Sequence, residues 1–238
     1  TNSTLAGALA ATKLHIPVAH VEAGLRSYNK KMPEEINRLL TDHVSRLLFV
    51  PTDNAVSNLK SEGITEGVVK SGDVMFDSYL VNKTIAASKS DILSKLNLNY
   101  RGYSLATVHR QENTEGSRRL ESIFQAFEEI GNKVHKIILP LHPRTRKALA
   151  EKEINVNNLA GIRVIEPVSY LDMVQLEVNA NVILTDSGGI QKEAYFAGVP
   201  CVTLRDETEW VETVEASVNF LVGADEDRIV EGYKKSLT

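Results

Sequence analysis

The stretch from residue 183 to residue 194, ILTDSGGIQKEA, decides the fold of the chain. A short apolar run precedes a Ser-Gly-Gly turn at 187–189 and helix-forming residues, which predicts a strand, a tight turn and a helix start. Glycines let the backbone approach an anion, and the free N–H groups of a helix start favour phosphate. Glu193, which follows Ser187 by six residues, could then accept hydrogen bonds from sugar hydroxyls.

The same stretch has a purely structural interpretation. Asp186 or Ser187 could be an ordinary helix cap, with Glu193 in solvent. The segment also matches neither of the common glycine-rich nucleotide-binding fingerprints. From this stretch alone, both interpretations stay open.

Short apolar runs alternate with helical patterns along the rest of the chain, which favours an α/β fold with parallel sheets covered on both faces. Towards the C-terminus we predict strands at 104–109, 136–141, 163–166, 182–185 and 199–204, and helices at 118–130, 170–178 and 191–196. Towards the N-terminus we predict a helix capped by Ser3 or Thr4, a buried strand at 17–21, a helix from Pro33 to about His43, a strand at 46–50, a helix at 52–59, a strand at 68–70 and a helix at 77–88. The polar stretch at 97–102 suggests a boundary between two domains, 1–98 and 99–238.

Composition narrows the class of protein. The 238 residues include 27 Lys and Arg against 31 Asp and Glu, a net charge of −4, which argues against nucleic-acid binding driven by bulk charge. No apolar run approaches the roughly 20 residues of a membrane span. The single cysteine, Cys201, can form no intrachain disulfide and no zinc site alone, so we expect a cytoplasmic protein without a metal.

Ligands of open parallel sheets bind beyond the carboxyl ends of the strands, which draws attention to the polar residues there. Glu22 ends the first predicted strand and Glu34 opens the next helix. Two carboxylates at one rim can act as acid and base if their surroundings separate their pKa values. Glu34 has an alternative role as a first-turn helix acid paired with Arg38, whereas Glu22 has no such structural explanation.

Histidine and arginine follow the first strand of the C-terminal half. His109 could move a proton near neutral pH or steady a diphosphate, and Arg110 could pair with a diphosphate. His142 has the same placement with weaker support. We expect Cys201 and Trp210 to be packing residues.

Six motifs, in this order and spacing, resemble those of the UDP-N-acetylglucosamine 2-epimerase family. They are HVEAGLRS (20–27), MPEEINR (32–38), TVHRQEN (107–113), LPLHPRT (139–145), TDSGGIQKEA (185–194) and TLRDETEWVET (203–213). The resemblance implies two Rossmann-like domains of glycosyltransferase-B type facing across a cleft, with the N-terminal one incomplete. It also implies a fragment that lacks the N-terminal strands and the C-terminal end and is inactive alone. Ser217 stands where relatives often have glycine, a residue that takes a positive φ cheaply.

Carried over to this chain, the resemblance implies specific roles. Glu22 and Glu34 would be the catalytic carboxylates and His109 the active-site histidine, while Ser187, Gly188 and Gly189 would hold the diphosphate and Glu193 the uridine ribose. The implied reaction inverts C2 of UDP-N-acetylglucosamine by eliminating UDP and adding it back, without a cofactor or metal. It would serve cell-surface polysaccharide biosynthesis in a cytoplasmic homodimer.

Three alternatives remain open on the sequence. A hydrolysing relative would release N-acetylmannosamine and UDP, and a 2-epimerase for a UDP-diacetamido sugar would differ in few sugar contacts. The third is a nucleotide-binding module without catalysis. In every case the expected partner is a UDP sugar, not a nucleic acid or a membrane.

Overall fold

The structure, a computed structural model, describes residues 2–115, 118–156 and 159–238. The chain divides into two compact units, Thr1–Ser78 and Tyr79–Thr238, and the division falls within helix α4 (Val74–Lys89). In the described ranges no helix combines the length and the apolar character that crossing a membrane requires. The units divide earlier than the domain boundary predicted at 98/99, and that boundary stays a prediction.

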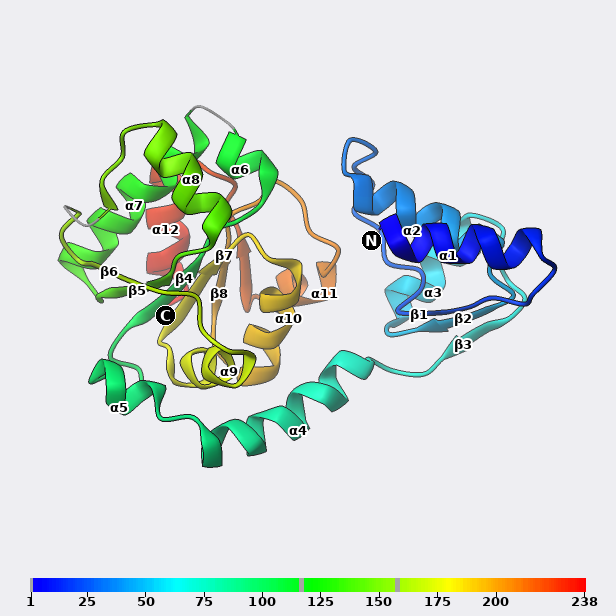
Figure 1. Cartoon of the computed structure of the whole chain (residues 1–238), viewed down its shortest axis with the longest axis horizontal. Helices are drawn as coiled ribbons and strands as arrows, with labels where there is room; N and C mark the ends of the chain where they lie inside the picture. The colour runs from blue at the N-terminus through cyan, green and yellow to red at the C-terminus, as the bar shows by residue number, and fades with distance from the viewer. Residues whose placement is uncertain (1, 116–117, 157–158) are drawn as a thin grey trace. The chain divides into compact units, whose positions relative to one another are not determined.

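The second unit is built on a parallel sheet with strand order β6-β5-β4-β7-β8-β9 (Figure 1). Its strands are β4 (Ser104–Thr107), β5 (Ile137–Pro140), β6 (Ile162–Ile165), β7 (Val182–Thr185), β8 (Cys201–Thr203) and β9 (Asn219–Leu221). The chain moves outward in one direction from β4 to β6 and then in the other from β7 to β9. The order therefore reverses between β4 and β7, as in Rossmann-like sheets that bind nucleotides at this point.

Helices cover both faces of this sheet. They are α5 (Ile92–Leu96), α6 (Gln111–Glu115), α7 (Arg119–Lys133), α8 (Pro143–Glu151), α9 (Tyr170–Asn179), α10 (Gly188–Ala197), α11 (Val211–Glu215) and α12 (Glu226–Lys235). Successive strand residues point to opposite faces, so Leu105 packs with α9 and α10, and Ala106 packs with α7 and α12. In Figure 1 the strands lie between these two helix groups.

Side-chain caps begin several of the helices and explain where the strand-end loops stop. Thr52, His142, Ser169, Ser187 and Asp225 each accept a hydrogen bond from a backbone N–H in the first turn of the helix that follows. Such caps satisfy donors that a helix start otherwise leaves without a partner. The loops that follow the strands therefore end at defined residues.

The first unit is a smaller parallel sheet in the order β1-β2-β3. Its elements are α1 (Asn2–Lys13), β1 (Ala19–Val21), α2 (Pro33–Val44), β2 (Leu47–Val50), α3 (Asp53–Ser61) and β3 (Val68–Lys70). The strand predicted as buried at 17–21 is β1, and that burial is wrong: Ala19 and Val21 are exposed. In the described sheet β1 pairs only with β2, so it lies at an edge.

The sequence patterns located the described strands other than β9 and seven of the described helices, but did not predict α8 or α12. The predicted strands at 68–70 and 182–185 coincide with β3 and β7. The caps proposed for the first helix are wrong, because α1 already begins at Asn2 and includes Ser3 and Thr4. The five-residue helices α5, α6 and α11 are also outside the predictions, because little more than one helical turn gives too little periodicity to recognise.

Ser217 has a φ of 57°, so the position where glycine was expected does adopt the left-handed conformation. Its N–H donates to the Val214 carbonyl at the end of α11. The serine accepts a conformation that non-glycine residues adopt at a cost of about 1 kcal/mol.

Two glycines let helix α7 approach the start of β6. A Cβ on Gly131 would lie 2.6 Å from the Gly161 carbonyl oxygen, and Gly161 has a φ of 83°. The same Gly161 carbonyl accepts the N–H of Ile137 at 2.9 Å. Any side chain at Gly131 must therefore displace backbone that belongs to the sheet.

We expect Gly131→Ala to destabilise the second unit by roughly 2 kcal/mol or more, although alanine favours helix by about 1 kcal/mol. Gly7→Ala in α1 is the matched control, because a Cβ there meets nothing within 4 Å. The control should be neutral or stabilising. Urea unfolding, followed for the transition of each unit, measures both; equal effects would contradict the close-approach explanation.

Candidate functional site

Asp186 joins the ends of the two central strands of the second unit. Its buried carboxylate accepts hydrogen bonds from the backbone N–H groups of His109, at 3.0 Å, and Arg110, at 2.9 Å. Asn113 Nδ2 donates to the same carboxylate at 3.1 Å. Asp186 is therefore not a helix cap. It holds the loop after β4 beside the turn after β7, at the reversal of strand order.

The start of α10 is a candidate anion-binding cradle. Ser187 is the N-cap, and its hydroxyl accepts the N–H of Ile190 at 3.4 Å. A Cβ on Gly188 would lie 3.7 Å from Arg110 Nη2 and 3.8 Å from both Arg205 Nη1 and Trp210 Nε1. Positive charge therefore surrounds a helix N-terminus, which itself favours anions.

Arg205 is fully buried beside this cradle. Its Nη1 donates to Glu209 at 2.9 Å, whereas Nε and Nη2 have no hydrogen-bond partner among the described residues. Trp210 is buried as predicted, and its indole N–H donates to the Gly188 carbonyl at 3.0 Å. The tryptophan thus holds the glycine turn, and the arginine keeps donor capacity for an anion.

Glu193 lies in the second turn of α10 and is almost completely buried. The Tyr170 hydroxyl donates to its carboxylate at 2.8 Å. The alternative that placed Glu193 in solvent is therefore wrong. A buried carboxylate with a fixed donor is suited to accept further hydrogen bonds from a ligand.

The surroundings of His109 lower its pKa and so favour the neutral imidazole. Burial lowers its pKa, and nearby His142, Arg110 and Arg144 lower it further. Asp186, whose Oδ1 lies 3.4 Å from His109 Nδ1, opposes this shift without cancelling it. His142 caps α8, and its ring centre lies 5.4 Å from that of His109. A neutral histidine can accept a proton or donate one ring N–H.

Glu22 and Glu34 lie in the first unit, on either side of one loop. Glu22 directly follows β1, is exposed, and has a φ of 69°. Glu34 is exposed in the first turn of α2. Arg38, proposed as the helix partner of Glu34, places its Nη2 3.6 Å from Glu35, and its Nε donates to the Glu34 backbone carbonyl at 3.4 Å. The ion pair between the Glu34 carboxylate and Arg38 stays a prediction. Positive φ in a non-glycine residue is strained and is found often at functional sites.

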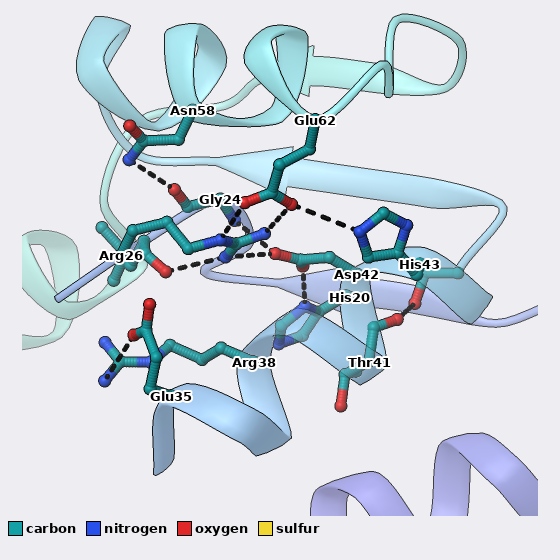
Figure 2. Close-up of polar contacts among 12 residues, drawn as sticks. His20, Gly24, Arg26, Glu35, Arg38, Thr41, Asp42, His43, Asn58 and Glu62 are labelled. Carbon is teal, nitrogen blue, oxygen red and sulfur yellow. Dashed lines mark hydrogen bonds and ion pairs between the residues drawn. The ribbon is translucent and has the colours of Figure 1, made fainter. Parts of the chain in front are cut away.

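A buried charge network holds the loop between these two acids (Figure 2). Arg26 donates to Asp42 at 2.7 Å and makes a two-point contact with Glu62 at 2.6 and 2.8 Å. Asp42 also pairs with His20 Nδ1 at 2.6 Å and accepts the Gly24 N–H at 3.1 Å. The network therefore links the end of β1 to α2 and to the end of α3.

Glu35 fixes the far side of the same loop. Its buried carboxylate accepts the backbone N–H groups of Ser27 and Tyr28 and the Ser27 hydroxyl, at 2.9 to 3.0 Å. Of the two glutamates after Pro33, one is thus a structural anchor and the other faces solvent. The sequence could not separate their roles, because neighbouring helix positions differ only in the direction that each side chain takes.

The comparison with known proteins agrees with this architecture. The described sheets and their helices form an α/β protein with Rossmann-like topology and a phosphate-binding type of strand, turn and helix. The profile of the UDP-N-acetylglucosamine 2-epimerase family matches residues 1–238. The chain belongs to this family, which confirms the resemblance and the predicted glycosyltransferase-B type of fold.

Individual relatives are similar over the whole chain. A UDP-N-acetylglucosamine 2-epimerase homolog of Methanococcus maripaludis is 55% identical over 238 residues, which are 99% of this chain and 66% of that protein. A UDP-2,3-diacetamido-2,3-dideoxy-D-glucuronate 2-epimerase of Pseudomonas aeruginosa is 52% identical over 240 residues, 100% of this chain and 65% of that protein. The crystal structure of Methanocaldococcus jannaschii UDP-GlcNAc 2-epimerase with UDP-GlcNAc and UDP has a TM-score of 0.94 and 46% identity, covering 100% of this chain and 67% of that one. The chain thus spans about two thirds of the length of these relatives.

The charge network generates a prediction. Burial would raise the pKa of Asp42, but hydrogen bonds from His20 and Arg26 outweigh it and lower that pKa. Asp42→Asn should destabilise the first unit by roughly 3 kcal/mol at pH 7, because it leaves Arg26 with half of its buried counter-charge. Since the folded pKa is depressed, the stabilisation exists above the ordinary value of about 3.9 and is lost as the pH falls below it.

The difference in the free energy of unfolding between the wild type and Asp42→Asn should therefore become smaller in acid. Urea unfolding at a series of pH values would measure it. Asp53→Asn in the same unit is the control, because its 2.6 Å pair with Lys70 is exposed and is worth less than about 1 kcal/mol. A control effect as large as that of Asp42→Asn would contradict the importance of burial.

Proposed function

We propose that the protein catalyses reversible epimerisation at C2 of UDP-N-acetylglucosamine, giving UDP-N-acetylmannosamine. The single observation that supports this most is the cradle at the start of α10. Arg110 and Arg205 face Gly188 there, and the buried Glu193 follows on the same helix. Positive charge at the helix start, followed by a buried carboxylate on the same helix, suits a ligand with a diphosphate next to a sugar bearing hydroxyl groups. Membership of the family and the nucleotide sugar bound to the M. jannaschii relative favour the same ligand.

In this proposal the second unit binds UDP. The N–H groups around Ser187, Gly188 and Gly189 donate to the diphosphate, and Arg110 offsets its charge. Glu193 accepts hydrogen bonds from the ribose hydroxyls. Donors already held in place stabilise the negative charge that grows on departing UDP, so binding and leaving-group stabilisation come from the same groups.

The chemistry is assigned to the two exposed acids of the first unit. A carboxylate removes the C2 proton as the C1–O bond to UDP breaks, and the C–H electron pair becomes the C1=C2 bond of a glycal. UDP then re-adds at C1 while a proton is delivered to the opposite face of C2. The C2 hydrogen is barely acidic, so departure of UDP must build positive charge at C1. Glu22 and Glu34 are the proposed base and acid, and neutral His109 assists at the diphosphate.

The P. aeruginosa relative favours a second candidate substrate, a UDP-2,3-diacetamido-2,3-dideoxy-D-glucuronate, because it is nearly as similar to this chain as the first relative. The UDP contacts proposed above would be common to both substrates. We further propose that the protein is a cytoplasmic homodimer. The single buried cysteine fits a reducing compartment, and sedimentation would measure the oligomeric state.

Proton NMR of the full-length protein in heavy water tests the reaction directly. With UDP-N-acetylglucosamine, we expect signals of the C2 epimer and solvent deuterium at C2. Accumulation of free N-acetylmannosamine would instead identify a hydrolysing enzyme. Turnover of only the diacetamido substrate in a parallel sample would establish the second candidate, and no deuterium incorporation with either would contradict the proposal.

Glu193→Ala should weaken UDP binding at least tenfold in calorimetry, because hydrogen bonds between a carboxylate and hydroxyls are worth roughly 1.5–3 kcal/mol. Glu231→Ala is a suitable control, since this exposed glutamate on α12 pairs only with Lys235 in the described structure. Unchanged affinity in Glu193→Ala would remove this residue from the nucleotide site.

Glu22→Gln and Glu34→Gln should each lower turnover by about 10² to 10⁴ while leaving UDP affinity nearly intact, as expected for a positioned acid or base. Glu66→Gln, at another exposed glutamate of the first unit, is the control. Melting temperatures identify damage to the fold. A variant that epimerises at the wild-type rate would exclude that residue from the mechanism, and a joint loss of affinity and turnover would indicate anchoring.

A further inference from the structure

A second buried glutamate, Glu177, interacts with Glu193. Glu177 belongs to α9, which packs against α10, and its side chain has no exposure to solvent. Within the described chain, neither Glu177 oxygen has a hydrogen-bond donor if both glutamates are ionised. An ionised carboxylate can only accept, so two facing carboxylates cannot bond to each other. A buried ion without a donor would be very unfavourable.

The groups around Glu177 supply no compensating positive charge. The titratable groups that interact with Glu177 are Tyr79 on α4, Tyr103 just before β4, Tyr170 on α9 and Cys201 on β8. Of these hydroxyls, Tyr103 donates to the Leu176 carbonyl at 2.6 Å and Tyr170 to Glu193, while the buried Tyr79 hydroxyl has no hydrogen-bond partner among the described residues. The surroundings of Glu177 are thus neutral apart from the charge on Glu193.

The nearest cation on α10 acts on Glu193. Lys192 Nζ lies 4.1 Å from the ring centre of Trp210, and its charge lowers the pKa of Glu193, whereas among the described residues Glu177 forms no ion pair with a Lys, Arg or His. A proton is therefore the remaining means of neutralising Glu177. Once Glu177 is protonated, its O–H can donate a hydrogen bond to Glu193.

The titration of the two groups agrees with this geometry. Burial raises the pKa of Glu177 well above its usual value, and the charge of Glu193 raises it further. Burial also raises the pKa of Glu193, while hydrogen bonds from Tyr170 and Glu177 hold it down. Glu193 is thus the partner that keeps its negative charge, and the two carboxyl groups titrate as a pair.

We propose that Glu177 is a neutral carboxylic acid that donates a hydrogen bond to the Glu193 carboxylate and thereby orients it towards the ribose. Glu177 is then a positioning residue, since it acts through Glu193 and does not touch the ligand itself. With Tyr170 and Glu177 both donating, Glu193 retains lone pairs for two ribose hydroxyls. The ribose-related part of this inference rests on the proposed function; the shared proton does not.

Stability as a function of pH tests the shared proton alone. A raised folded pKa means that the native state holds a proton that the unfolded state releases above about pH 4.3. Wild-type stability should therefore fall with rising pH, relative to Glu177→Gln, which is neutral at every pH and still offers an N–H donor. We expect the folding equilibrium constants to separate by about tenfold per pH unit until the proton is lost.

Glu151→Gln, at an exposed glutamate on α8, is the matched control and should run parallel to the wild type throughout. The infrared difference spectrum between the wild type and Glu177→Gln should also contain the C=O stretch of a protonated carboxyl group. Parallel stability curves for wild type and Glu177→Gln, without this band, would overturn the shared proton.

UDP affinity in the full-length protein tests the positioning role. Near pH 6, Glu177→Gln should bind UDP within about twofold of the wild type, whereas Glu177→Leu, which removes the donor, should bind at least tenfold more weakly. On raising the pH, wild-type affinity should fall relative to Glu177→Gln. A merely structural role would affect melting of both variants without this difference in pH profile.

The shared proton and the positioning role can be contradicted separately. Wild-type affinity in Glu177→Leu would overturn the positioning role while the proposed UDP site stands. No UDP binding by the wild type would overturn the proposed function together with the positioning role. The stability curves would still decide the shared proton in either case.

Discussion

The buried carboxylate of Asp186 is the constraint on which the candidate nucleotide site depends. Asp186 directly follows β7 and accepts the N–H groups of His109 and Arg110, which follow β4. Neighbouring parallel strands bring such ends together, but only a buried acceptor with several donors fixes their separation. The histidine, the arginine and the start of α10 are therefore parts of one rigid edge rather than three independent loops.

The first unit uses buried charge for a similar purpose. Arg26, Asp42 and Glu62 connect the loop after β1 to two helices, while Glu35 closes the loop from the other end. Buried ion pairs often contribute little net stability, because desolvation offsets attraction. Here their effect is positional, since the loop they hold is bounded by two exposed acids. Glu22 and Glu34 face solvent, and these buried contacts hold the backbone of the loop between them.

Much of this arrangement was accessible from local patterns. Alternation of short apolar runs with helices predicted the parallel α/β fold, and the polar residues at the strand ends gave the candidate site, which stays a prediction. Ser187, Gly188 and Gly189 were recognised because a glycine turn before a helix has a local physical meaning. Six motifs in order then identified the family. These features depend on residues close together in sequence.

Only the tertiary structure decided which distant groups meet. Asp186 was interpreted as a possible cap, and its bonds to a loop more than seventy residues earlier were not predictable. Glu177 had no local signal at all, because its meaning arises from packing α9 against α10 beside Glu193. The sequence by itself determined the alternation of strands and helices, the Ser-Gly-Gly turn and the family. Burial, and with it the charge state of each acid, was decided by folding, since desolvation and hydrogen bonding depend on neighbours that only the packed chain supplies.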